Sequence, residues 1–191
     1  MPMDYPFVAL RADAVPRAVM PFAQHMLDTY ASETNKVASV WHAFTDDDLR
    51  YRPHPRAMCV ADVLKHQLLS ERRFFGEFLQ IDEPAASTVL PQETGVSAHV
   101  ARLVDLARPR LSALAGRDER WWLETAPFFD VERQRAWIFW RRVLHTAHHR
   151  AQLVVYLRML GRTVPATYGP TADVTWSGAD PTTSVDAAAR A

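Results

Sequence analysis

Apolar residues recur every three or four positions along four long stretches of the chain, and no stretch shows sustained alternation of apolar and polar residues. The first spacing places side chains on one face of an α-helix, whereas alternation is typical of a strand. The pattern therefore predicts an all-α protein. The predicted helices cover about residues 13–44, 60–83, 96–115 and 131–160.

Proline and glycine set the expected ends of these helices. Asp13 is a plausible cap for the first helix, and Pro16 suits its first turn. Pro84 ends the second helix, and Gly161 stops the last one. Pro109 lies inside the third helix, where a missing N–H and a clash with the preceding turn predict a kink or an early end.

The lengths of the helices and loops predict one four-helix bundle with long crossing connections, because two of the joining loops exceed ten residues. Residues 1–170 would form this single domain. Residues 171–191 are rich in Thr, Ala, Ser and Asp without periodicity, which predicts a flexible tail that Trp176 could anchor in part.

Composition narrows the class of protein. Apolar residues make up 48% and charged residues 23%, as in a water-soluble globular chain. The 22 basic and 22 acidic residues cancel, so nothing favours a nucleic-acid or membrane partner. The single Cys59 cannot form an internal disulfide, and we expect a cytoplasmic protein. A homodimer is compatible with such a bundle, although no isolated apolar stripe requires one.

The stretch RRVLHTAHHRAQLVVYLRMLG, residues 141–161, carries three histidines inside an otherwise buried helical pattern. On a helix, His145 and His149 lie about 40° apart on the inward face, while His148 lies about 60° to the other side of His145. Cβ atoms one turn apart are separated by about 5–6 Å, and two imidazole nitrogens on one tetrahedral ion by about 3.3 Å. The pair can therefore converge on one metal ion.

His66 is the best candidate for a third ligand, because it lies in the second helix among residues that a bundle would bury. It falls towards the edge of the apolar stripe, so an ion there would be open to solvent on one side. Three neutral imidazoles leave a position for a water or a thiol, which loses its proton more readily beside a divalent cation. Cys59 could close the site instead, as a fourth ligand.

A simpler interpretation makes these histidines ordinary core residues that hydrogen-bond their neighbours. The arginines of the last helix are expected to extend to the surface or to pair with acids. Arg141 lies towards the histidine face and is a candidate contact for an anion or a substrate, and Arg150 is a second candidate for orienting an anionic substrate.

The segments VLKHQLLSERRFF and LHTAHHRAQLVVYLRMLG, preceded by LRYRPHPRAM and followed by YGP, resemble the DinB and YfiT-like superfamily of metal-dependent proteins. The resemblance covers about residues 20–170 and implies a four-helix bundle. It also implies a triad, usually of histidines, that binds a divalent ion, often nickel or zinc. The triad falls on His66, His145 and His149, and Arg150 and Gln152 match an Arg-x-Gln motif.

The resemblance leaves the reaction open. Some members are S-transferases or isomerases that use low-molecular-weight thiols such as bacillithiol or mycothiol, and others look like hydrolases. The leading expectation is a thiol-transferase type of metal-dependent enzyme acting on a small molecule. The alternatives are a metal-dependent hydrolase and a stress-related bundle that binds metal or ligand without turnover.

Overall fold

A computed structural model describes residues 8–174 of the chain, and this part is mostly helical, as predicted. Its helices and strands are α1 (Gln24–His42), α2 (Val60–Arg73), α3 (Ala86–Val89), α4 (Val96–Ala115), α5 (Glu119–Leu123), β1 (Thr125–Phe128), β2 (Val131–Gln134) and α6 (Arg135–Met159). Short 3₁₀ turns precede α1 and follow it, and α2 continues into a π-helical turn over Phe74–Phe78.

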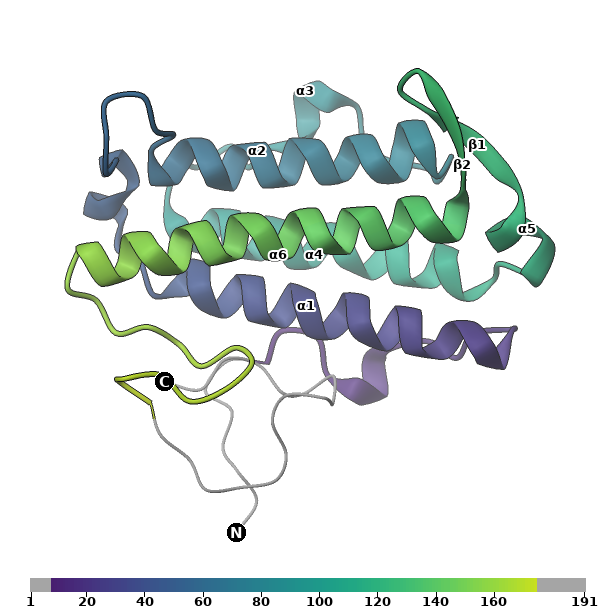
Figure 1. The fold of residues 1–191 in the computed structure, drawn as a ribbon, viewed down its shortest axis with the longest axis horizontal. Helices are drawn as coiled ribbons and strands as arrows, with labels where there is room; N and C mark the ends of the chain where they lie inside the picture. Colours follow the sequence, from purple (N-terminus) through teal and green to yellow (C-terminus); the bar gives the residue numbers. More distant parts are fainter. Residues whose placement is uncertain (1–7, 175–191) are drawn as a thin grey trace, which may run out of the picture.

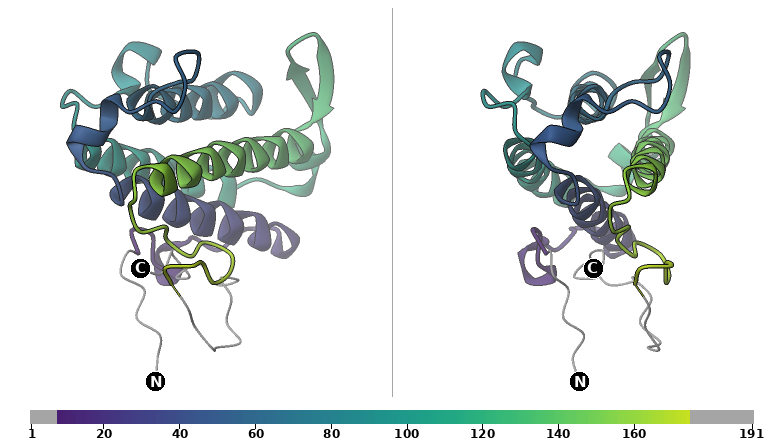
Figure 2. Two further views of the ribbon diagram at one scale, coloured as in Figure 1. Left: turned by 60° about the vertical axis from the view of Figure 1, so that its left-hand side comes forward. Right: turned by 90° about the vertical axis from the view of Figure 1, so that its left-hand side faces the viewer.

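The long helices α1, α2, α4 and α6 lie side by side (Figures 1 and 2). Helix α1 packs against α4 and α6, and α2 packs against α6. Helices α2 and α4 run in the same direction, so the segment that joins them, which includes α3, must return along the length of α2 (Figure 1). Asp46 accepts a hydrogen bond from the Val96 backbone at 2.8 Å, which ties the start of α4 to the loop before α2.

The buried apolar residues form two clusters, one towards each end of the long helices. The first contains Tyr30 on α1 and Phe139 on α6, and the second contains Val37 and Leu153 on the same two helices. Buried polar residues occupy the intervening turns, including Glu33 on α1. A polar layer therefore crosses the core between the two apolar clusters.

The first helix begins at Gln24 and not near residues 13–16. Asp13 makes no cap, because it lies inside a single 3₁₀ turn of three residues. Met20 precedes Pro21 and is extended, with φ −106° and ψ 110°, as expected for a residue that a following proline excludes from the α region. The chain before α1 instead folds back, and the Asn35 side-chain oxygen accepts from the backbone of Leu10 at 2.8 Å.

The last helix begins at Arg135, and Val131 belongs to a β-hairpin that the sequence analysis did not predict. The two antiparallel strands contain four residues each, too few for alternation to stand out. Pro127 in β1 cannot donate a backbone hydrogen bond and would disrupt a helix interior. The hairpin stands beside the start of α6 (Figure 1).

Helix α4 continues through Pro109 to Ala115, so the expected early end is wrong. Pro109 and Asp105, whose carbonyl loses its partner, are both exposed, and water can satisfy that carbonyl. Every helix within residues 8–174 is too short or too polar to span a membrane. Beyond Val174 the predicted tail, with Trp176, lies outside the described residues.

Candidate metal centre

The structure brings His66, on α2, together with His145 and His149, on α6. One ring nitrogen from each residue lies within 4.8 Å of the others. The ring centroids are 4.6 Å apart for His145 and His149, 4.7 Å for His66 and His149, and 5.4 Å for His66 and His145. The packing of α2 against α6 therefore supplies the third imidazole that the one-turn pair on α6 needs.

The triad lies at the edge of the core. His149 is buried at 8% exposure, whereas His66 and His145 are half-buried, so one side of the cluster faces solvent. His148 is exposed and its ring lies 5.0 Å from that of His149. Cys59 immediately precedes α2, where its side chain accepts a helix-capping hydrogen bond, and it does not belong to the cluster.

All three imidazoles are held in their neutral form. Burial, followed by the charge of Arg142, lowers the pKa of His145 to about 3. Burial also lowers the pKa values of His66 and His149. A histidine must be neutral to bind a metal ion, and three converging neutral imidazoles are a donor set that fits zinc or nickel.

A short hydrogen-bond chain orients His149. The Gln152 side-chain oxygen lies 3.0 Å from His149 Nδ1, and because this oxygen can only accept, Nδ1 carries the proton and Nε2 keeps its lone pair. Gln152 donates to the Tyr156 hydroxyl at 2.8 Å, and that hydroxyl donates to the Met58 carbonyl at 3.1 Å. The sequence analysis matched Gln152 to a motif without a role, and the structure shows it holding the ring.

His145 has a different partner. A guanidinium nitrogen of Arg142 lies 2.8 Å from His145 Nδ1, and a guanidinium can only donate. The proton of the neutral His145 ring is therefore on Nε2, and this ring can bind a metal ion as a neutral ligand through Nε2 only when the proton moves to Nδ1 and the hydrogen bond from Arg142 is given up. Arg142 thus places a fixed positive charge against the triad.

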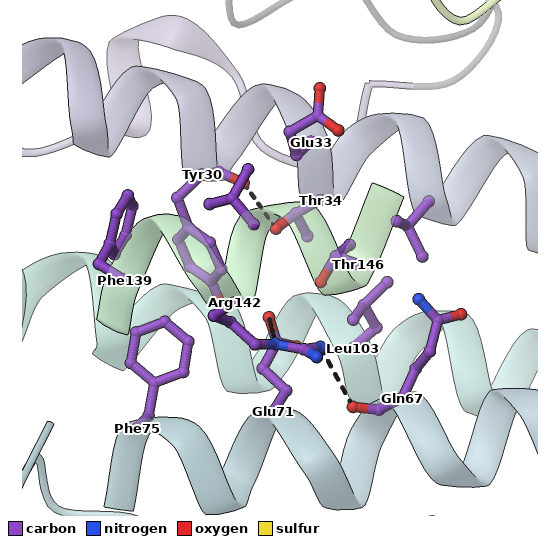
Figure 3. Close-up of a pocket in the computed structure, with 12 residues that line it drawn as sticks. Tyr30, Glu33, Thr34, Gln67, Glu71, Phe75, Leu103, Phe139, Arg142 and Thr146 are labelled. Atoms are coloured by element: carbon purple, nitrogen blue, oxygen red, sulfur yellow. Dashed lines mark hydrogen bonds and ion pairs between the residues drawn. The ribbon is translucent and has the colours of Figure 1, made fainter. Parts of the chain in front are cut away.

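Arg142 is completely surrounded by protein and lies in the polar layer between the apolar clusters (Figure 3). Its guanidinium lies 3.6 Å from one oxygen of Glu71, and Arg110 lies 3.1 Å from the other. Arg110 is also paired with Glu83. The sequence analysis did not single out Glu71, although a carboxylate on the apolar face of α2, one turn after Gln67, was the available signal.

Beside Arg142, the core of the described residues has no room for a substrate. The cavity beside Arg142, which Tyr30, Gln67 and Thr146 help to line, has a volume of about 10 Å³ (Figure 3). This is the space of about one water molecule. A substrate of this site must therefore approach the triad from its solvent-facing side.

The two predicted substrate contacts lie in different surroundings. Arg150 is buried, pairs with Glu33 on α1, and has its guanidinium 4.6 Å from the Tyr168 ring centroid. Arg141 is exposed, and its charge contributes to the lowered pKa of His145. Arg141 is therefore the arginine of the predicted pair that an approaching anion can reach.

Comparison with known proteins identifies the class of protein. The family model of the DinB family matches residues 20–178, so the chain belongs to the DinB family. A DinB-like protein from Bacillus cereus ATCC 10987 has a TM-score of 0.63 at 18% identity, with 73% of this chain and 93% of that chain covered. A DinB-like protein from Bacillus subtilis has a TM-score of 0.58 at 21% identity, with the same coverage. No functionally curated protein matches.

The lowered pKa values predict how stability depends on pH. In the unfolded chain the three histidines bind protons below about pH 6.5, whereas in the folded chain the pKa values of His66 and His149 are lowered and that of His145 is about 3. The free energy of unfolding of chelator-treated protein should therefore fall as the pH drops from about 6.5 to 5. Urea titrations at several pH values should show that His145→Gln reduces the pH dependence of the free energy of unfolding by an amount equivalent to up to about one bound proton. The matched control is His54→Gln in an exposed loop. A pH dependence that His145→Gln leaves unchanged would contradict the prediction.

The buried ion pairs predict a large effect at Glu71. Glu71→Gln leaves Arg142 without a counter-charge in the core, and we expect the free energy of unfolding to fall by about 3 kcal/mol. The exposed Glu77 pairs with Arg72 and Arg73, and Glu77→Gln should cost less than about 1 kcal/mol. Equal losses in urea unfolding for the two variants would show that Glu71 does not balance a buried cation.

Proposed function

We propose that this DinB-family protein binds one divalent metal ion, zinc or nickel, through His66, His145 and His149. The observation that supports this is the convergence of three neutral imidazoles within 4.8 Å of one another. We further propose that the long helices form the four-helix bundle with crossing connections expected of the family, and that the protein works in the cytoplasm on a small molecule.

We infer that the reaction is an S-transfer from a low-molecular-weight thiol to an electrophilic substrate. The metal ion would lower the pKa of a thiol or water that reaches the solvent-facing side of the triad. Gln152 keeps the His149 ring in one tautomer and orientation. Arg142 disfavours protonation of His145, and Arg141 is placed to bind an anionic group of the substrate.

Metal content tests the first part of the proposal. Tag-free protein, stripped with a chelator and reloaded with zinc, should contain about one ion per chain by elemental analysis. His145→Ala should lose most of this metal, because two imidazoles remain. The control His148→Ala changes an exposed neighbour on the same helix and should retain the ion. Zinc retained in full by His145→Ala would refute the assigned ligands.

Product formation tests the second part. Zinc-loaded protein should conjugate bacillithiol or mycothiol to 1-chloro-2,4-dinitrobenzene, and chelation or His66→Ala should abolish the metal-dependent rate. Mass spectrometry of the products follows the new carbon–sulfur bond and the released chloride. Metal-dependent hydrolysis of esters without added thiol would favour the hydrolase instead. Stoichiometric zinc without turnover of either kind would indicate a binding protein.

A further inference from the structure

We infer that the surface between the β-hairpin and the histidine triad binds a planar aromatic anion, with its ring on Phe129 and Trp137 and its negative group on Arg141. The inference rests on the proposed function, because it assigns a substrate class to the same site.

Phe129 is the first sign of a binding surface. It is 61% exposed and has φ 55°, in the left-handed region that favours glycine. Phe128 pairs with Val131, so Phe129 is the first of two turn residues, a position of positive φ in type II′ turns that glycine usually occupies. The ring is only partly covered, by Phe78, Phe128 and Arg73, and the residue adds backbone strain at a position that suits glycine.

Aromatic rings lead from the hairpin to the triad. Phe128 lies 4.8 Å from Phe129 and 5.3 Å from Trp137, measured between ring centroids. Phe74 lies 5.8 Å from Phe128 and stacks on His145 at 6.0 Å. The exposed rings at the hairpin are therefore joined to the candidate metal centre by a series of ring contacts through the buried Phe128 and Phe74.

Arg141 lies between the exposed rings at the hairpin and the histidine triad. Trp137, Arg141 and His145 are one turn apart on α6, so about 12 Å of helix separates the first from the last. Arg73 and Arg133, which stack on Phe129 and Trp137, have partners in Glu77 and the Glu132 carbonyl. Within residues 8–174, Arg141 makes neither a hydrogen bond nor an ion pair, and its exposed guanidinium is available to an anion.

These three features together define the ligand. Exposed aromatic rings bind a flat apolar group through stacking, and a guanidinium binds a carboxylate or a similar anion through paired hydrogen bonds. A molecule about 12 Å long would span from Trp137 to the triad and bring its reactive carbon to the solvent-facing imidazoles. An aromatic acid with an electrophilic centre fits these constraints.

Calorimetry with 1-naphthoate and its uncharged analogue 1-naphthamide tests the inference on the full chain, both zinc-loaded and chelator-treated. We expect 1-naphthoate to bind more tightly in both states, and Arg141→Gln to weaken it about tenfold while changing 1-naphthamide less than about twofold. The control Arg50→Gln, at an exposed residue of the 43–59 loop, should alter neither affinity.

Phe129→Gly separates binding from folding. Glycine suits the left-handed φ, so the variant should keep its circular dichroism spectrum, yet it should bind both probes about fivefold more weakly. Two results would overturn the inference: equal affinities for the two probes, or a dimer in which a second copy covers Phe129 and Trp137. The measurement on chelator-treated protein needs no metal. A failure of zinc binding would therefore refute the proposed function without affecting the test of aromatic-anion binding.

Discussion

A guanidinium buried in the middle of a helical core constrains everything packed around it. Arg142 lies where the two apolar clusters meet, and removing such a cation from water is costly unless a carboxylate and hydrogen-bond acceptors surround it. Glu71 supplies the charge, and the Gln67 carbonyl and the Ser70 hydroxyl accept hydrogen bonds. All three partners belong to consecutive turns of α2, so the position of α2 relative to α6 is fixed at this level.

The same constraint governs the candidate metal centre. His66 belongs to α2, and His145 lies less than one turn beyond Arg142 on α6. The contacts that hold Arg142 therefore also hold the third imidazole at its distance from the other two. Because the Arg142 charge and burial both oppose protonation, the rings stay neutral, as metal ligands must be. The charge of Arg142 also makes the binding of a metal cation beside it less favourable. We infer that the carboxylate of Glu71 offsets part of this repulsion.

Helical periodicity identified α4 and the start of α2, whereas α2 ends at Arg73 and its π-helical turn at Phe78, before the predicted end near residue 83. The one-turn spacing of His145 and His149 predicted their convergence. The start of α1 was missed because a proline can begin a helix or exclude the residue before it, and only the packed structure decides which. The hairpin was missed because four-residue strands are shorter than the window in which alternation is visible. Glu71 was missed because its pairing with Arg142 is long-range and leaves no spacing in one sequence. Gln152 lies only three residues after His149, and the sequence analysis matched it to a motif without a role.

The β-hairpin gives one end of α6 an aromatic surface. At the hairpin end of α6, exposed aromatic rings from β1–β2 and α6 continue into the Phe74 ring on the π-helical turn after α2. That turn has one more residue in its hydrogen-bonded loop than an α-helical turn, as Leu79 shows by donating to Phe74. Phe74 begins this turn, its own N–H still donates to the Ser70 carbonyl as in an α-helix, and its ring contacts both His145 and the hairpin. The local departure from α-helix thus changes the positions of the residues after Phe74, and Phe78 at its end contacts Phe74, Phe128 and Phe129.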